Sequence, residues 1–369
     1  MLEKKRAAAY ISKAALRNNV NVIKSYIDNN TKVSAVVKAD AYGHGMKEVT
    51  ESIDDIIDYY IVAIEEEAYE LRKYTDKDIL LLGYATKENI EKVFENKITL
   101  SLLNDEYMNF LKKEALKRSK KLKVHLKLDT AMRRVGYYVD WNDIDKTVNK
   151  ISDIIKDENF IFEGLYSHFS TADNENLDFA LQQGNIFKEI VDKLKDKGII
   201  FDIVHMANSA AIFKLPQFHF DMVRTGIILY GLHPSDYVYD KRLIPVMSFV
   251  SHIAQIKEIK KGDSIGYSRK FISDRNMKTA VIPVGYADGV SRLLANKGVF
   301  YIKNRPCKIL GNICMDQCVV DITGMDVTLY ERAELFSDSY NIASVSKLMN
   351  TIDYEVTCLI TKRVPRILY

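Results

Sequence analysis

This sequence has few of the residues that mark a secreted, fibrous or membrane protein. Its 369 residues include four cysteines, six prolines and one tryptophan. In so long a chain, four cysteines do not amount to the dense disulfide framework of a small secreted domain. We therefore interpret them as reduced, buried thiols; they are Cys307, Cys314, Cys318 and Cys358. No stretch approaches the roughly 18 uninterrupted apolar residues that a membrane-spanning helix needs.

An excess of charge of one sign is also lacking. Lys and Arg total 53 against 50 Asp and Glu, a net charge of +3, which does not indicate a nucleic-acid-binding protein. The one basic tract, Lys112–Lys123, has seven Lys or Arg but little aromatic interleaving, so we interpret it as a solvated helix face. The first ten residues lack the apolar core of a secretory signal. These absences predict a soluble, cytoplasmic protein that binds neither nucleic acid nor a membrane.

Apolar residues, by contrast, are plentiful at 47%, and the length suits two domains or one barrel with an appendage. Eight apolar runs of strand length alternate with helical patterns such as Leu16, Val20 and Ile23. The strands are predicted at Val33–Val37, Tyr60–Ile64, Ile79–Leu82, Ile98–Leu102, Leu122–Leu128, Phe162–Ser167, Phe201–His205 and Phe220–Arg224. Because parallel neighbours need a helix-length crossover, the alternation favours an α/β protein with a TIM-type (β/α)8 barrel. An open doubly wound sheet is the alternative.

The pattern changes after Leu232 to short segments rich in Val, Ile and Tyr, separated by turn signals. Strands are predicted at Met247–Lys257, Lys278–Val284, Val299–Lys303 and Ile313–Ile322, and one helix near Ile342–Met349. Cys314 and Cys318 fit the alternation of the last strand as core residues. We therefore predict a barrel domain over residues 1–238 and a C-terminal β-rich domain over residues 239–369.

Chargeable residues follow the predicted barrel strands, where barrel enzymes place their active sites. Lys38 comes directly after an apolar strand. A lysine in this place is commonly a solvated cap, but a desolvated lysine is also the usual attachment point for pyridoxal phosphate. Ser209 and Gly226 follow the last two strands, where barrel enzymes often bind phosphate. Both functional and structural roles fit His44, His168 and His205, and no histidines have zinc-like spacing, so no metal is predicted.

Several segments resemble, in order, those of the alanine racemase family. The segment Val36–Gly45 (VVKADAYGHG) is similar to the family's pyridoxal phosphate attachment segment, and Lys127–Gly136 to its substrate-arginine segment. The resemblance continues through Gly164–Phe169, Asn208–Ala210, Val223–Gly231, Gly262–Tyr267, Ile282–Gly289, Gly311–Asp316 and Arg363–Arg366. It covers nearly the whole chain. It implies a barrel, a C-terminal β domain and a homodimer whose active sites are shared between subunits.

The resemblance also implies pyridoxal 5′-phosphate as cofactor and a role for each matching residue. Lys38 would hold the cofactor and act as one catalytic base, and Tyr267 of the partner subunit would be the base on the opposite face. Inversion needs both, since one base removes the α-proton and the other returns it. The remaining implied residues are Tyr42, His168, Asn208, Ser209, Arg224, Gly226 and Ile227 for the cofactor, Arg134 and Met315 for the substrate, and Lys127, Asp316 and Tyr286 in support.

Arg224 has the most informative implied role. Many pyridoxal enzymes protonate the pyridine nitrogen with a carboxylate, which makes the ring a strong electron sink. An arginine stays protonated and donates to that nitrogen, which leaves a weaker sink that suits reprotonation over side reactions. Phenols ionise near pH 10, so Tyr267 needs support, and His168 and Arg224 are the implied helpers. Lys127 matches a position that is carbamylated in family members.

Three positions depart from the family's usual pattern. Ala131 and Arg133 stand where glycines commonly flank Met132, and Lys362 stands where a tyrosine commonly precedes Arg363. Lys362 either alters the choice of amino acid or reflects neutral drift. The resemblance thus implies an alanine racemase, with a serine or broad-specificity racemase as the alternative. A barrel-type amino-acid decarboxylase or a pyridoxal phosphate carrier fits less well, because neither needs a second base in an added domain.

Overall fold

The computed structural model describes residues 5–369. Residues 1–4, which begin the ten-residue segment without a secretory signal, lie outside the described residues. The chain divides into two compact units. The barrel unit comprises Arg17–Ala39 and Thr50–Leu243, and the β-rich unit comprises the N-terminal segment up to Leu16, Asp40–Val49 and Ile244–Tyr369. The sequence predicts a single division after residue 238. The compact units differ from that division because two early segments belong with the β-rich unit.

Eight parallel strands build the barrel unit, in the spatial order β10-β2-β3-β4-β5-β6-β8-β9. Their bounds are β2 Lys32–Val36, β3 Tyr59–Val62, β4 Ile79–Leu81, β5 Thr99–Leu102, β6 Leu122–Asp129, β8 Phe160–Tyr166, β9 Ile203–His205 and β10 Met222–Thr225. The two-residue strand β7 (Tyr137–Tyr138) pairs with β6. Backbone N–H groups of Asp221 and Arg224 donate to the carbonyls of Val204 and Ala207, each at 3.0 Å, and nearly close the ring between β9 and β10. Every predicted barrel strand overlaps an observed one, which confirms the barrel.

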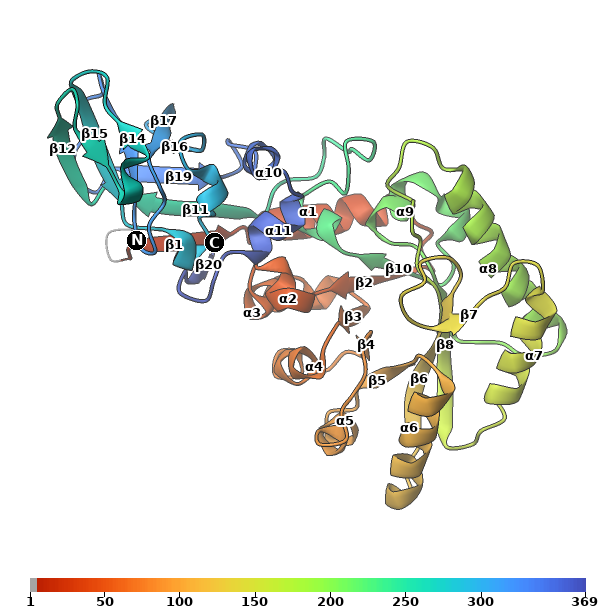
Figure 1. Ribbon diagram of the computed structural model, residues 1–369. Helices are drawn as coiled ribbons and strands as arrows, with labels where there is room; N and C mark the ends of the chain where they lie inside the picture. Colours follow the sequence, from red (N-terminus) through yellow and green to blue (C-terminus); the bar gives the residue numbers. More distant parts are fainter. Residues whose placement is uncertain (1–4) are drawn as a thin grey trace. The chain divides into compact units, whose positions relative to one another are not determined.

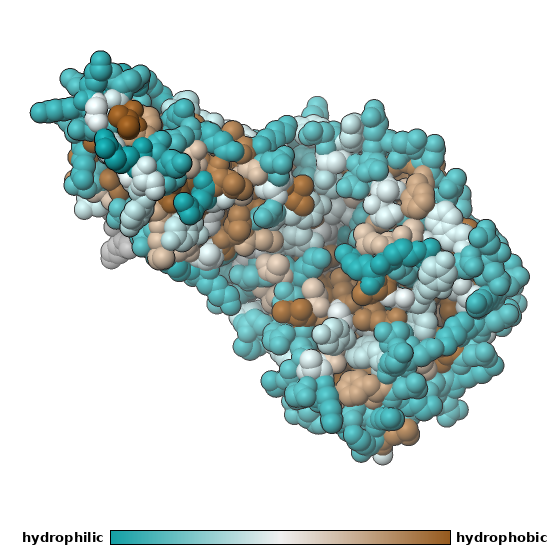
Figure 2. All heavy atoms as spheres, viewed as in Figure 1, coloured by the Kyte–Doolittle hydropathy of each residue, from teal (hydrophilic) through white to brown (hydrophobic). Residues whose placement is uncertain are grey.

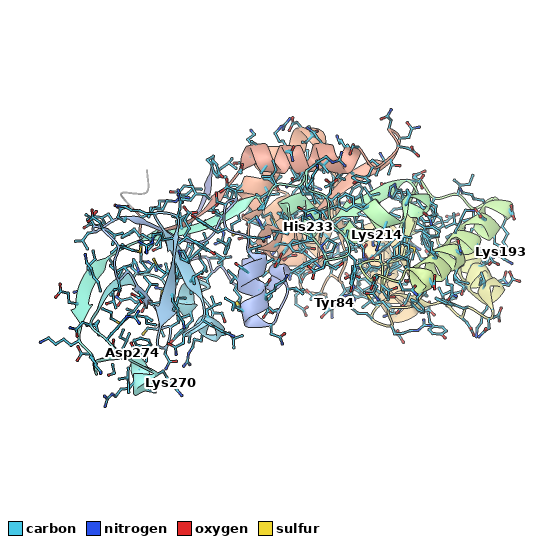
Figure 3. All side chains as sticks on the ribbon, turned by 90° about the horizontal axis from the view of Figure 1, so that it is seen from above. Tyr84, Lys193, Lys214, His233, Lys270 and Asp274 are labelled. Carbon is cyan, nitrogen blue, oxygen red and sulfur yellow. The ribbon has the colours of Figure 1, made fainter. Side chains whose placement is uncertain are left out.

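Helices connect these strands and lie on their outer side, as Figure 1 shows for α4 through α8. The helices are α1 Lys13–Lys24, α2 Lys38–Tyr42, α3 Met46–Ile53, α4 Glu65–Leu71, α5 Ile90–Glu95, α6 Asp105–Arg118, α7 Ile144–Ile154, α8 Asp178–Asp196 and α9 Ser209–Lys214. The basic tract begins on α6. Several of its side chains form ion pairs with acidic residues, for example Lys112 with Asp157 at 2.7 Å. The visible outer face of the helices is mostly hydrophilic (Figure 2). Lys193, labelled on α8 in Figure 3, lies 2.8 Å from Asp145 of α7.

The β-rich unit is organised around a nine-stranded sheet in the order β12-β15-β18-β17-β16-β19-β11-β1-β20. Its strands are β1 Ala7–Ile11, β11 Met247–His252, β12 Gln255–Ile259, β15 Met277–Ile282, β16 Val299–Ile302, β17 Arg305–Leu310, β18 Cys318–Asp321, β19 Arg332–Phe336 and β20 Arg366–Leu368. A separate ribbon pairs β13 (Ser264–Ile265) with β14 (Phe271–Ile272). The C-terminal part of this unit, Ile244–Tyr369, contributes the helices α10 Ala343–Met349 and α11 Asp353–Cys358.

Strand β1 explains why the start of the chain belongs to the β-rich unit. It pairs antiparallel with β11 and parallel with β20, so both ends of the chain share one sheet (Figure 1). The sequence pattern does not predict β1, β17, β19, β20 or α11. The predicted strand Met247–Lys257 is two strands, and only the end of Ile313–Ile322 is a strand.

The cysteines are less uniformly buried than the sequence predicts. Cys307 and Cys318 are buried, Cys314 is half-buried and Cys358 is exposed at the end of α11, and none forms a disulfide. The prediction of four buried thiols is therefore wrong for Cys358, because α11 turns this residue outward. Among the described residues, no helix combines the length and the apolar character needed to cross a membrane.

The segment that follows Lys38 has an unusual backbone. Residues Ala39–Tyr42 of α2 have φ between 52° and 55°, so this turn is left-handed. Such a conformation costs roughly 1–2 kcal/mol per residue for L-amino acids. Within the β-rich unit, the Arg366 guanidinium donates to the Gly43 carbonyl at 2.7 and 2.9 Å, and the Met46 N–H donates to the Asp40 carboxylate at 2.7 Å. These contacts stabilise the turn.

Candidate functional site

Lys38 lies at the carboxyl end of β2, as the sequence predicts. The strand beside it, β10, is fixed by side-chain hydrogen bonds to backbone carbonyls. The Ser34 hydroxyl donates to Val223 and the Thr225 hydroxyl donates to Ser34, both at 2.8 Å. The Ala39 N–H donates to the Glu67 carboxylate at 2.6 Å, which anchors the backbone directly after Lys38. The position of Lys38 relative to β10 is therefore well defined.

Arg224 is the most densely bonded side chain of the site. It lies on β10 with only 4% of its surface exposed. One terminal nitrogen donates to His205 Nδ1 at 2.9 Å, and the other donates to His168 Nδ1 at 2.7 Å and to the Ser167 carbonyl at 2.9 Å. Burial lowers the pKa of the guanidinium to about 10. Arg224 therefore remains a cation at neutral pH, held from several sides.

His168 follows β8 and is neutral in this setting. Burial, and then the charge of Arg224, lowers the pKa of His168 well below its usual range. Because Arg224 can only donate, His168 Nδ1 must accept, so its hydrogen is on Nε2. Lys38 is among the charges that act on this imidazole. The arrangement leaves His168 with one N–H that can donate to a group in the site.

The segments after β9 and β10 bind each other. The Ser209 hydroxyl accepts from the Gly226 N–H at 3.0 Å, and the Asn208 side chain caps α9 by accepting from the Ala211 N–H at 3.1 Å. Ile227 begins the short 3-10 turn η4 (Ile227–Tyr230). A hydroxyl and the starts of two helical turns form a donor set that suits a phosphate group. Together with Lys38 and the cationic donor Arg224, this set fits the pyridoxal phosphate that the family resemblance implies.

Lys127 lies on β6 and is almost fully buried. Its ammonium nitrogen is 2.7 Å from the Leu128 carbonyl and 5.1 Å from the centre of the Tyr166 ring. Burial, and then the charges of Arg224 and Arg134, lower the pKa of Lys127 to about 7. A large share of this amine is therefore neutral at physiological pH, which is the form that reacts with carbon dioxide.

Arg134 lies in the loop after β6, and its side chain is exposed. The Asp129 carboxylate accepts from the backbone N–H groups of Arg133 and Arg134, both at 2.9 Å, and so shapes this loop. Arg133, where the family commonly has glycine, has a φ of 54° and lies over the Tyr138 ring at 4.2 Å. At this departure from the family pattern, a residue with a long side chain therefore adopts a backbone conformation that favours glycine.

The candidate residues of the β-rich unit lie on loops that are bonded to one another. The Asn312 side chain donates to the Tyr267 carbonyl at 3.0 Å, and the Ala287 N–H donates to the Met315 carbonyl at 3.1 Å. Tyr286 is joined to this network, since its N–H donates to the Cys314 carbonyl at 3.1 Å. The side chains of Tyr267 and Met315 nevertheless face solvent, with 74% and 52% of their residue surface exposed.

One buried carboxylate and one exposed ion pair stabilise these loops. Asp288 receives a bidentate pair from Arg6 at 2.6 and 2.8 Å and the N–H of Gly285 at 3.0 Å. Burial alone would raise the pKa of Asp288, but these hydrogen bonds lower it overall. Asp316 pairs with Arg363 at 2.7 Å, and Lys362 beside it is exposed.

The predicted site residues therefore fall into two groups. The barrel unit contains Lys38, Lys127, Arg134, His168, Asn208, Ser209, Arg224, Gly226 and Ile227. The β-rich unit contains Tyr42, Tyr267, Tyr286, Met315 and Asp316, with the Tyr42 ring 5.9 Å from that of Tyr354. Among residues 5–369, no group of three or more metal-ligating side chains is close enough to hold an ion.

The sequence does not reveal the buried residues that are linked to Arg224 by hydrogen bonds inside the barrel. His205 was open to a structural or a functional role, and His125, Glu163 and Tyr166 received no role of their own. The available signal was the period-2 pattern of β6, because alternation places Lys123, His125 and Lys127 on one face of the strand. Three basic side chains on one face of a barrel strand indicate a polar interior.

Comparison with known proteins gives matches over nearly the whole chain. The family model described as "Alanine racemase, N-terminal domain" matches residues 11–234, and that described as "Alanine racemase, C-terminal domain" matches residues 246–368. An alanine racemase of Methanococcus maripaludis is 38% identical over 368 residues, which cover 97% of this chain and 97% of the relative.

Solved structures agree with these matches. The alanine racemase of Clostridium difficile 630 superposes with a TM-score of 0.94 at 36% identity, covering 100% of this chain and 96% of that chain. The alanine racemase of Bartonella henselae, solved with covalently bound pyridoxal phosphate, has a TM-score of 0.88 at 29% identity, covering 99% of this chain and 100% of that chain.

Proposed function

The chain belongs to the alanine racemase family, and from this premise we propose that it interconverts L- and D-alanine with pyridoxal phosphate and two bases. The observation that carries the proposal is the pairing of a strand-end lysine with a buried arginine. Lys38 follows β2, and Arg224 on the neighbouring strand is cationic and bonded to two histidines. A barrel-type decarboxylase fits this arrangement poorly, because decarboxylation gains from a protonated cofactor ring.

The cofactor would be held by the residues that the family resemblance implies for it. When bound, pyridoxal phosphate withdraws electrons from the α-carbon of an amino acid and makes its α-hydrogen acidic. Lys38 would hold it covalently. Tyr42, Ser209, Gly226 and Ile227 would bind its phosphate, partly through backbone N–H groups. Asn208 would also belong to the cofactor site. The proposal that the bound group is pyridoxal phosphate is supported by the covalent complex of the Bartonella henselae relative.

Arg224 would donate a hydrogen bond to the ring nitrogen without giving up its proton. Its pKa of about 10 keeps it protonated at neutral pH, so it would act on the ring nitrogen as a hydrogen-bond donor and not as an acid. A ring held in this way would withdraw electrons less strongly than a protonated ring, which would favour racemisation over transamination.

Two bases on opposite faces would transfer the α-proton. Lys38 would serve one face and Tyr267 of the partner subunit the other. His168 supports this role, because its Nε2–H can donate to a phenolate oxygen and stabilise the ionised form. Tyr286 and Asp316 would support the loops around Tyr267. The exposed side chain of Tyr267 is consistent with a residue that completes the site of a second copy in a homodimer.

Substrate binding would use Arg134 and Met315. Arg134 would bind the substrate carboxylate, and Met315 of the partner subunit would offer its backbone to the same group. Lys127 would be a carbamate whose added carboxylate steadies Arg134. Cytoplasmic localisation remains a prediction from the sequence.

The decisive experiment incubates the purified, cofactor-loaded protein with one L-amino acid at a time and resolves the enantiomers of each product. We expect D-alanine from L-alanine, approaching equal amounts of the two, and much slower conversion of L-serine. Faster conversion of serine would favour the broad-specificity alternative, which the exposed Lys362 motivates. Release of carbon dioxide with formation of an amine would instead identify a decarboxylase.

A further inference from the structure

A line of hydrogen bonds runs through the barrel interior, starting at Arg224. His205 Nδ1 on β9 accepts from Arg224 at 2.9 Å. His205 Nε2 lies 2.8 Å from His125 Nδ1 on β6, and His125 Nε2 lies 2.9 Å from Glu163 Oε2 on β8. Four side chains from four strands therefore form one continuous chain.

The two ends of this chain fix the direction of every hydrogen bond. A guanidinium has only donors, and an ionised carboxylate has only acceptors. His205 Nδ1 must therefore accept from Arg224, so its hydrogen is on Nε2 and points to His125. His125 Nδ1 must accept in turn, so its hydrogen is on Nε2 and points to Glu163. Each imidazole has exactly one tautomer that satisfies both of its neighbours.

The charges in the chain agree with this direction. Burial lowers the pKa of both His125 and His205, so both imidazoles are neutral. Burial alone would raise the pKa of Glu163, but hydrogen bonds from His125 and Lys123 lower it to about 2, so the carboxylate is ionised. A proton added to either histidine would set two donors against each other.

The packing around the chain leaves the two imidazoles little freedom. Both histidines are fully buried, and the Tyr166 ring lies parallel to that of His205 with the ring centres 4.7 Å apart. Gly164 faces His125, where any Cβ would collide with the imidazole. The Tyr59 hydroxyl donates to Glu163 Oε2 at 2.9 Å, and Lys123 pairs with Glu163 Oε1 at 2.9 Å. Both carboxylate oxygens are therefore held in place.

We propose that Glu163 is a positioning residue that sets the tautomers of His125 and His205 and thereby holds Arg224 as a donor. Without the carboxylate, His125 can place its hydrogen on Nδ1, which opposes the Nε2–H of His205. His205 then changes tautomer, and its Nδ1–H points at the Arg224 guanidinium. A donor facing a donor displaces Arg224 from its geometry. The consequence for turnover rests on the proposed function, but the tautomers do not.

The test uses protein labelled with 15N at histidine and measures the ring nitrogens by NMR, together with kcat and KM for alanine. For the parent we expect both buried histidines to be neutral with hydrogen on Nε2. Glu163→Gln should populate the Nδ1–H tautomer of His125, because an amide can donate as well as accept. We expect kcat to fall by roughly 10-fold with KM little changed, a typical cost of losing an outer partner. Glu163→Asp, which keeps the charge, should retain the parental tautomers.

Asp78→Asn is the matched control. Asp78 pairs with the same Lys123 at 2.8 Å, so this variant also removes a carboxylate partner of Lys123 but leaves the histidine chain intact. It should preserve the tautomers and kcat. The proposal is overturned if Glu163→Gln keeps both parental tautomers, whatever its stability, or if Asp78→Asn changes them equally. A parent protein that does not racemise alanine would refute the proposed function and leave the tautomer measurement valid.

Discussion

The two groups of candidate residues differ sharply in how their side chains are held. In the barrel unit, Arg224 is buried and its guanidinium contacts two imidazoles and backbone carbonyls. In the β-rich unit, Tyr267 is 74% exposed, and the hydrogen bond described for it involves its backbone carbonyl. Arg224 is ordered by its own surroundings, whereas Tyr267 is presented on a loop that is bonded through its backbone. The difference is what we expect when one group completes a site on another copy.

The most severe test of this comparison disables each group separately. Lys38→Ala and Tyr267→Ala should each abolish racemisation, because each homodimer lacks one base in both sites. When the two inactive proteins are dissociated, mixed and re-formed, about half of the dimers are mixed, and each has one intact site. Roughly a quarter of the parental activity should return, given two-fold pairing. The assay is the racemisation rate of the re-formed mixture.

Tyr330→Ala is the control for exposure, since Tyr330 is also 74% exposed in the β-rich unit. It should remain active alone. If confirmed heterodimers of Lys38→Ala and Tyr267→Ala stay inactive, these residues do not act together across two chains.

A second prediction concerns the stability of the β-rich loops. Asp288→Ala leaves Arg6 and the Gly285 N–H without their buried acceptor, so we expect a loss of about 2 kcal/mol in the free energy of unfolding of that unit. Asp55→Ala removes the partner of Arg17 in an exposed pair, 2.6 Å apart, and should change stability little. Denaturant midpoints of both variants measure the difference. Equal midpoints would show that burial does not decide the strength of these pairs.

A third prediction follows from the depressed pKa of Lys127 in the barrel. Because folding favours the neutral amine, the neutral fraction rises as pH increases through about 7, and carbamate formation should rise with it. Carbon-13 NMR under labelled carbon dioxide between pH 6 and 8 measures this directly. Lys123 on the same strand has a raised pKa, since its hydrogen bonds with Asp78 and Glu163 outweigh burial, and it should not react. A carbamate signal that persists in Lys127→Met would place the modification elsewhere.

The smallest expected effect is on stability and concerns Arg133, in the loop after β6 of the barrel unit. Both Arg133→Gly and Arg133→Ala lose the contact with Tyr138, but only glycine adopts a φ of 54° without steric cost. The glycine variant should therefore be more stable than the alanine variant by about 1 kcal/mol. Thermal or denaturant unfolding of the pair tests this. An alanine variant of equal stability would mean that the loop relaxes out of the left-handed region.

The barrel could be predicted from sequence because each strand is a continuous apolar run followed by a helical pattern. The strands β17 and β19 could not, because charged residues such as Arg305, Lys308 and Glu334 interrupt their apolar pattern. Strand β1 is short and Ala-rich, and its partners are more than two hundred residues away in the chain.

The same reasoning applies to the site. Lys38, His168 and Arg224 were predictable because each lies at the end of an apolar strand. The contribution of His125 and Glu163 was not, because it depends on which strands are neighbours in the closed barrel. Local patterning gives the faces of strands but not the contacts across the interior.

The left-handed turn after Lys38 also has a consequence for the order of events during synthesis. The Gly43 carbonyl next to this turn accepts a hydrogen bond from the Arg366 guanidinium, and Arg366 lies 323 residues later in the chain. A growing polypeptide leaves the ribosome from its N-terminus, and earlier domains fold first. The barrel strands can therefore assemble while the turn still lacks the guanidinium that stabilises it. We expect the attachment segment to reach its final shape only after translation has passed Arg366, so that cofactor loading follows completion of the β-rich unit.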